Sequence, residues 1–313
     1  MSEVNSKLGA PFLSILAEHP LVELVGVVTS PPGRLCPYFL GEEDQVDLEA
    51  QARRRGVTLL RPPDVNAAET VFAIAALNPD YIIVGNYQQI LKAELLAVPR
   101  IMPINFHPSP LPSYAGWAPF FWMARNGETE SGVTAISMTV HIDGGPTIAA
   151  KPIRLSGTET ALEIRESHTV ANVALLRELI PRLAAGAPPT VPQDPSRRTY
   201  FSKPRDQDYW LDFTQDAETI LCTVRAGYRR PGAYVVTEDG NTLVVLSMES
   251  VGSRYPASVT PGSVRREDGD VFIAAKDGWL RLWSIEVDGE ERLGHLPRSH
   301  TSVRTWFEAR AAG

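Results

Sequence analysis

The residues whose types could do chemistry are concentrated between Asn105 and Pro146. Asn105 and His107 are two positions apart at the end of a strand-like run, so both side chains should leave the same face of a strand. Asp143 follows about 36 residues later in a glycine-rich loop, just past another strand-like run. An amide can donate to a developing oxyanion, an imidazole can move a proton, and a carboxylate can orient that imidazole. Brought together, the three groups would make a plausible acyl-transfer site.

The elements that must position these residues follow an alternating pattern in the front half of the chain. We expect strands at 22–29, 57–60, 81–84, 101–106 and 132–138, and helices at 8–17, 44–55, 67–77 and 160–183. This alternation is typical of an α/β domain with a Rossmann-like, mainly parallel sheet. Thr160 and Glu163 form a capping-box pair for the last helix, which Pro181 would kink or end. Since doubly wound folds build clefts at the carboxyl ends of parallel strands, we expect the candidate residues to meet there.

The pattern changes after a proline-rich stretch at 186–204, whose composition is typical of an extended linker. One short helix at 216–226 is followed by strand-like runs at 242–248, 270–275 and 279–283. Short strands at this spacing indicate a small β-barrel. The predicted domains are therefore a catalytic domain at 1–185, a linker at 186–204 and a smaller β-barrel domain at 205–313.

Composition narrows the class of protein further. The 313 residues are 43% hydrophobic and 21% charged, which is enough for about two domains with their own cores. Cys36 and Cys222 cannot form a disulfide framework or a four-cysteine zinc site, so we expect two structural thiols and no metal. The net charge of −7 argues against a globally basic nucleic-acid binder. Neither a membrane span nor a signal peptide is recognisable, and we expect a cytoplasmic protein.

The block from Asn105 to Pro146 resembles the signature of the formyltransferases that use 10-formyltetrahydrofolate. That family shows an Asn-x-His pair, a Ser-x-Leu-Pro-x-Tyr-x-Gly turn, a Gly-Val-Thr strand and an Asp-x-Gly loop. Here the matching segments are 105–107, 109–116, 132–134 and 143–145, in the family order. Segments 199–213 and 225–236 resemble the entry to the C-terminal barrel domain of methionyl-tRNA formyltransferase-like members. The resemblance is tight over 81–150 and looser elsewhere.

The resemblance implies transfer of a formyl group from 10-formyltetrahydrofolate to an amine. It assigns catalysis to Asn105 as oxyanion donor, His107 as base and Asp143 as the carboxylate that holds the imidazole. The segment 86–91 is similar to the family segment whose backbone helps to hold the pteridine. The residues that the resemblance assigns to the co-substrate are Gln88, Gln89, Ile90, Leu91, Val140 and Asp143.

The acceptor is less defined than the chemistry. The segment 30–45 is acidic in its second half, where the tRNA-modifying members carry a longer basic insertion. We therefore expect an amine on a small metabolite, either a nucleotide-linked amino sugar or an ornithine-type amine of siderophore or natural-product assembly. Methionyl-tRNA formyltransferase is the alternative, followed by a formyltetrahydrofolate hydrolase or an inactive folate-binding protein. The turn reads Tyr114-Ala115-Gly116 where the family often has an arginine, which affects substrate choice.

The start of the chain departs from the family pattern. Family members open with a hydrophobic strand that leads into a helix similar to 8–16. Residues 1–6 instead resemble the loop that follows such a strand, with too few apolar residues to form a central strand. Either the first strand is missing from this chain or the domain begins differently, and one hypothesis is that the recorded start lies a few residues downstream of the natural one.

Overall fold

The computed structural model describes residues 1–40, 44–229, 231–252, 259–294, 296 and 300–304. These residues form two compact units. The first unit contains 1–116, 130–154 and 166–200, and the second contains 117–129, 155–165 and the chain from 201 onward. The chain thus passes between the units more than once, and residues 186–200 of the predicted linker pack with the first unit.

The first unit is built on a four-stranded sheet in the order β3-β4-β6-β7. Its strands are β3 (Tyr81–Val84), β4 (Met102–His107), β6 (Glu130–Ser137) and β7 (Thr147–Arg154). β3 and β4 are parallel, whereas β6 runs antiparallel to β4 and β7 runs antiparallel to β6. The α/β fold is confirmed, with the parallel pair β3–β4 at one edge of this sheet, and each of these strands except β7 was expected from the sequence. The antiparallel β6 changes how Asp143 reaches the site.

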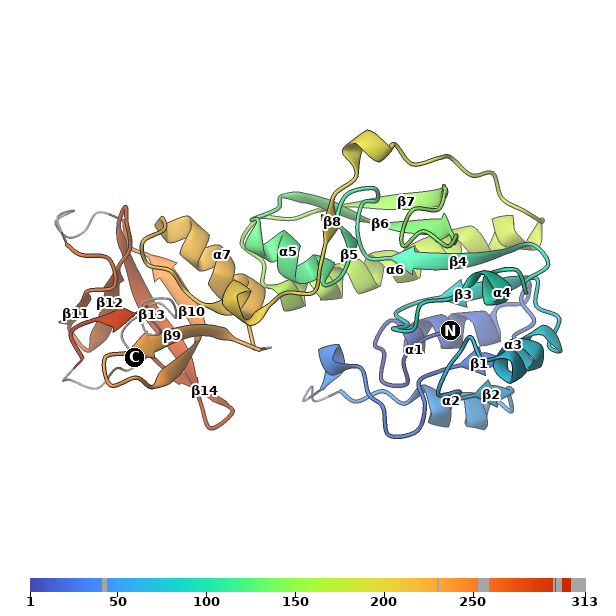
Figure 1. Ribbon diagram of the computed structural model, residues 1–313, viewed down its shortest axis with the longest axis horizontal. Helices are drawn as coiled ribbons and strands as arrows, with labels where there is room; N and C mark the ends of the chain where they lie inside the picture. Colours follow the sequence, from blue (N-terminus) through green and yellow to red (C-terminus); the bar gives the residue numbers. More distant parts are fainter. Residues whose placement is uncertain (41–43, 230, 253–258, 295, 297–299, 305–313) are drawn as a thin grey trace. The chain divides into compact units, whose positions relative to one another are not determined.

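Helix α6 (Ala161–Ala184) covers one face of this sheet (Figure 1). Its buried leucines pack against inward-facing strand residues in one cluster, which includes Ile104, Phe106, Val133, Leu175, Leu176 and Leu179. The capping box is confirmed, because the Thr160 and Glu163 side chains each accept the other residue's N–H. Pro181 lies inside the helix, which continues to Ala184 and so does not end at the proline. The Pro181 carbonyl still accepts the Ala185 N–H, because a proline lacks the N–H donor but keeps its carbonyl.

The remaining front elements surround a separate two-stranded parallel sheet of β1 (Val27–Val28) and β2 (Leu59–Leu60). The helices are α1 (Gly9–Glu18), α2 (Leu48–Arg54), α3 (Ala68–Ala75) and α4 (Ala93–Leu96), with a 3₁₀ turn η1 (Pro37–Phe39). The strand expected at 22–29 is reduced to its last apolar pair, and no described strand pairs with β1 on its other side.

Residues Met1 and Ser2 lie between β1 and β3. The Met1 amine donates to the Ile83 carbonyl, and the Gly85 N–H donates to the Met1 carbonyl. The Ser2 N–H donates to the Val28 carbonyl on the other side. These are the hydrogen bonds of a short parallel strand, so the first two residues occupy one end of a strand position between the two sheets. The expectation that 1–6 cannot form a full strand agrees with this arrangement.

A cavity of about 50 Å³ lies against Met1 and Ser2. Its walls come from α1, β1 and β3, and include Phe12, Leu13, Leu16, Leu24, Val27 and Ile83. The apolar lining indicates that this space is suited to hydrophobic side chains.

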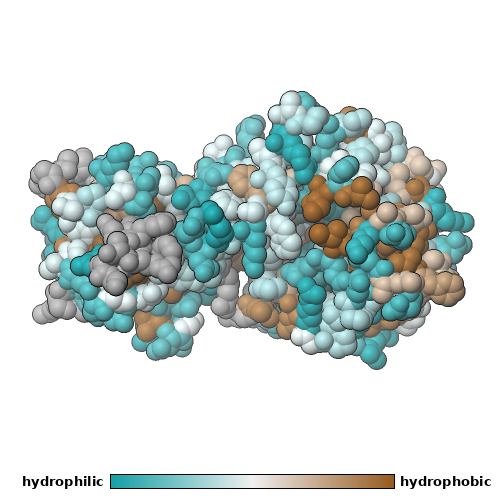
Figure 2. Space-filling view, viewed as in Figure 1, coloured by the Kyte–Doolittle hydropathy of each residue, from teal (hydrophilic) through white to brown (hydrophobic). Residues whose placement is uncertain are grey.

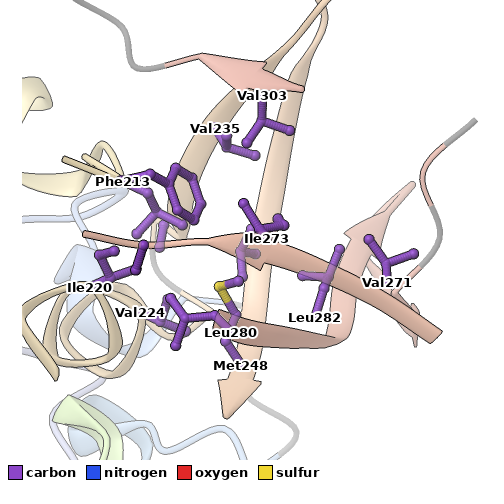
Figure 3. Close-up of a cluster of buried hydrophobic side chains, with 14 of the residues drawn as sticks. Phe213, Ile220, Val224, Val235, Met248, Val271, Ile273, Leu280, Leu282 and Val303 are labelled. Carbon is purple, nitrogen blue, oxygen red and sulfur yellow. The ribbon is translucent and has the colours of Figure 1, made fainter. Parts of the chain in front are cut away.

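The second unit pairs α5 (Pro119–Arg125) and α7 (Ala217–Gly227) with a seven-stranded antiparallel sheet. The strands are β9 (Ala233–Thr237), β10 (Thr242–Ser250), β11 (Val264–Glu267), β12 (Asp270–Ala274), β13 (Trp279–Val287), β14 (Glu290–Leu293) and β15 (Val303–Arg304). Figure 3 shows Phe213, Ile220 and Val224 pointing toward sheet residues such as Ile273 and Leu280. The predicted C-terminal barrel is thus an antiparallel half-barrel. None of the helices in the described ranges is long and apolar enough to cross a membrane.

Candidate active site

Strand β4 places Asn105 and His107 on the same face, as its alternation predicts. Phe106 between them is buried in the core beneath α6. Asn105 is half-buried, and its side-chain amide makes no hydrogen bond to any residue that the structure describes. Its N–H groups are therefore available to a bound molecule.

His107 is 6% exposed and lies between two oxygen atoms. Its Nε2 lies 3.2 Å from the Tyr114 carbonyl oxygen, and its Nδ1 lies 3.4 Å from Asp143 Oδ1. A carbonyl and a carboxylate both only accept, so each contact becomes a hydrogen bond when the ring nitrogen that faces it carries a proton. The two oxygen atoms therefore fix the plane and the orientation of the imidazole between them.

Asp143 reaches His107 from the β6–β7 connection. Because β6 runs antiparallel to β4, its end at Ser137 pairs near Ile104 rather than beside His107. The expectation that Asp143 and His107 meet at the carboxyl ends of parallel strands was therefore wrong in its reason, since the connecting loop carries Asp143 back to His107. The loop doubles back tightly at Gly145, where a Cβ atom would lie 1.7 Å from the Ser137 carbonyl oxygen.

The carboxylate of Asp143 is fixed on both of its oxygen atoms. Oδ1 faces His107, and Oδ2 accepts the Gly116 N–H at 2.9 Å. The Asp143 side chain is only 10% exposed. The carboxylate is therefore held in one orientation against the imidazole and is largely shielded from water.

Other motif residues hold the turn that supplies these contacts. Thr134 on β6 donates from Oγ1 to the Ser109 carbonyl and accepts the Leu111 N–H. Ser109 in turn donates to the Ser113 carbonyl at 2.9 Å. The Gly-Val-Thr strand and the Ser-x-Leu-Pro turn are thus joined directly, and together they set the position of the Tyr114 carbonyl.

The residues predicted to hold the co-substrate differ in accessibility. Ile90 and Val140 are 59% and 62% exposed, while Leu91 is buried in a core cluster and can offer only its main chain to a ligand. Gln88 donates to the Cys36 sulfur, and Gln89 accepts the Val65 N–H. Figure 2 shows hydrophobic surface over the part of the chain that contains β3, β4 and the β6–β7 connection. The assignment of Gln88, Gln89, Ile90, Leu91 and Val140 to the co-substrate stays a prediction.

Sequence reasoning missed two side chains of the site, Gln193 and Arg198. Both lie in the segment interpreted as a linker, and both donate to carbonyl groups of the Asp143 loop. No motif or spacing signals this contact, because the residues are about 50 positions from Asp143 and their composition is that of a loop.

Residues 5–180 of this chain match the model of the formyl transferase family, and residues 203–295 match the model of the formyl transferase C-terminal domain. The chain belongs to the formyl transferase family. It is therefore an enzyme that transfers formyl groups.

Individual relatives agree with the family. The chain is 30% identical over 296 residues to a methionyl-tRNA formyltransferase of Thermotoga maritima, covering 91% of both chains. A methionyl-tRNA formyltransferase of Geobacter metallireducens is 32% identical over 243 residues, covering 77% of this chain and 76% of that one. The solved N-formyltransferase of Helicobacter canadensis superposes with a TM-score of 0.68 at 16% identity, over 89% of this chain and 96% of that one, which shows the shared fold.

Proposed function

We propose that this formyltransferase moves a formyl group from 10-formyltetrahydrofolate to an amine of a small metabolite. The observation that carries the catalytic part is the arrangement of an unpartnered Asn105 amide beside a His107–Asp143 pair on one strand face. The donor supplies an activated formyl carbon bound to a weakly basic nitrogen. The exposed apolar side chains of Ile90 and Val140 are suited to a flat pteridine ring.

In the proposed reaction the acceptor nitrogen bonds to the formyl carbon, and the bond from that carbon to the folate nitrogen breaks. Asn105 donates to the formyl oxygen as negative charge develops there. His107 accepts the acceptor's proton on its imidazole ring. Asp143 stabilises the imidazolium that results, and the proton then passes to the departing folate nitrogen. No covalent enzyme intermediate is required, so Cys36 and Cys222 take no part.

The charge of the C-terminal part of the chain, residues 201–313, supports a small acceptor. Residues 201–313 contain 14 Lys and Arg against 17 Asp and Glu. Several arginines there are already paired, including Arg225 with Glu218, Arg229 with Glu291 and Arg281 with Asp270. Binding of a polyanion such as tRNA depends on cations that neutralise phosphates, and a net acidic domain with paired arginines is poorly suited to it.

The relatives point to both acceptor classes. The Helicobacter canadensis N-formyltransferase was crystallised with folinic acid and dTDP-3-aminofucose, which supports an amino sugar carried on a nucleotide. The methionyl-tRNA formyltransferases of Thermotoga maritima and Geobacter metallireducens are similar over most of the chain, and they make tRNA the second candidate.

The test is an acceptor panel with 10-formyltetrahydrofolate as donor. The acceptors are a dTDP-linked amino sugar, ornithine, N-hydroxyornithine and methionyl-tRNA, with mass detection of the formylated product. We expect turnover with one of the small amines, none with methionyl-tRNA, and turnover reduced by about 10²–10⁴-fold for the Asp143→Asn enzyme. Formylation of methionyl-tRNA alone would overturn the small-acceptor proposal. Release of formate without any acceptor would instead indicate a hydrolase.

A further inference from the structure

The segment from Val191 to Thr199 contacts both loops that touch His107. We refer to it as the strap. It begins with a pair of main-chain hydrogen bonds of 2.8 Å between Val191 and Thr147, the first residue of β7. From there it passes the Asp143 loop and ends beside the Tyr114 turn. All of these residues belong to the first unit.

On the Asp143 loop the strap contributes two side chains. Gln193 Nε2 donates to the Asp143 carbonyl at 2.9 Å and to the Gly145 carbonyl at 2.6 Å. Arg198 donates to the Ile142 carbonyl at 2.8 Å and to the Asp143 carbonyl at 3.3 Å. The Asp143 carbonyl therefore accepts from both side chains, and its backbone is fixed on either side.

On the Tyr114 turn the strap contributes Thr199. Its Oγ1 accepts the Tyr114 N–H at 2.8 Å, and its carbonyl accepts the Ala115 N–H at 3.0 Å. Its own N–H donates to the Pro112 carbonyl at 3.2 Å. The peptide groups on either side of Tyr114 are thus held by one residue of the strap.

The two residues that face His107 have unfavourable backbone angles. Tyr114 has φ 57° and Asp143 has φ 50°, in the left-handed region that non-glycine residues seldom adopt. Such a conformation persists only when the surrounding structure determines it. The strap supplies hydrogen bonds to both.

We infer that Gln193, Arg198 and Thr199 are positioning residues that hold Asp143 and the Tyr114 carbonyl against the two nitrogens of His107. The inference rests on the proposed function for its effect on turnover. Loss of the Arg198 guanidinium would leave the Ile142 carbonyl without this donor and the Asp143 carbonyl with Gln193 alone, and would let the carboxylate move from Nδ1. Misplacement of a catalytic group by about 1 Å can lower a rate by on the order of 100-fold.

The test is a double-substitution cycle in formyl transfer. Arg198→Ala should lower kcat by about 10- to 100-fold, with little change in the KM for the donor. Arg198→Lys should recover part of the lost kcat. In an Asp143→Asn background, Arg198→Ala should change kcat by less than about twofold, because the group it positions is already lost. Arg197→Ala is the matched control, since Arg197 is adjacent and exposed. An equal loss in both backgrounds would overturn the inference.

A readout without turnover separates this inference from the proposed function. In the Arg198→Ala protein, the ¹⁵N resonance of His107 Nδ1 should move toward its position in the Asp143→Asn protein. If Arg198→Ala fails to fold, Gln193→Met, which removes only the amide donors, is measured in the same way. Unchanged resonances in every strap variant would overturn the inference. Full turnover of the Asp143→Asn enzyme would contradict the proposed catalytic role alone, and the resonance would still decide whether the strap positions Asp143.

Discussion

His107 Nδ1 lies 3.4 Å from Asp143 Oδ1, and the opposite ring nitrogen lies 3.2 Å from the Tyr114 carbonyl. Together these contacts place an acceptor oxygen beside each ring nitrogen, one from a carbonyl and one from a carboxylate. The imidazole is thereby oriented before any substrate binds, which is the condition for efficient proton transfer in a cleft.

Replacement of Asp143 by Asn should lower formyl transfer by about 10²–10⁴-fold, because the amide cannot stabilise a charge on His107. The Gly116 N–H can still donate to the amide oxygen, so the fold should be retained. Initial rates at saturating donor and acceptor measure the effect, with circular dichroism as the check on folding. Asp80→Asn serves as control, since that carboxylate pairs with Arg100 at an exposed site. Turnover of Asp143→Asn within threefold of the native enzyme would remove Asp143 from the mechanism.

Replacement of Asn105 by Leu should lower kcat by about 10²–10³-fold, the usual loss for a missing oxyanion donor. Because the Asn105 amide makes no hydrogen bond within the described chain, its removal leaves no partner unsatisfied. The melting temperature should therefore stay within a few degrees of the native value. A large loss of stability together with normal kcat would assign Asn105 to structure instead of catalysis.

Extension of the chain by about four apolar, β-branched residues before Met1 should stabilise the first unit. Such a segment would continue the short strand of Met1 and Ser2 between β1 and β3. Its side chains would fill the apolar cavity that Phe12 and Leu13 line. Burial of each added methylene contributes about 0.8 kcal/mol. Thermal unfolding of this protein is compared with that of a Gly-Ser extension of equal length. Equal melting temperatures for the two extensions would show that the position does not accept a strand.

Acidification should weaken the second unit through Glu238. Hydrogen bonds from Ser302 and Thr301 lower the pKa of this carboxyl to about 2 from its ordinary value of 4.5. The unfolded chain therefore takes up a proton near pH 4.5 that the folded chain does not bind until about pH 2. The stabilising contribution is complete above pH 4.5 and is lost as the pH falls toward 2.

The Glu238→Gln variant should show a smaller fall in melting temperature between pH 5 and pH 3 than the native protein. Glu290→Gln is the control, because that exposed carboxylate pairs with Arg292 and has no other side-chain partner in the described part of the chain. An equal fall in melting temperature between pH 5 and pH 3 for Glu238→Gln and the native protein would show that another group causes the acid sensitivity.

Much of the first unit could be predicted from local sequence. The β-branched run 81–84 forms β3 at the predicted residues, and the helix opened by Thr160 and Glu163 begins where its capping box predicts. These features depend on side-chain periodicity and caps, which a few neighbouring residues determine. The placement of Asn105 and His107 on one face follows from the same strand geometry.

The sequence determined which groups could do the chemistry, through the identity and spacing of Asn105, His107 and Asp143. The tertiary structure decided how Asp143 arrives, which nitrogen of His107 faces it, and that Gln193 and Arg198 hold its loop. These outcomes depend on the direction of β6, on left-handed backbone at two positions, and on hydrogen bonds between residues far apart in the chain. Such contacts form only when the whole unit has packed, because no local pattern encodes a hydrogen bond across about 50 residues.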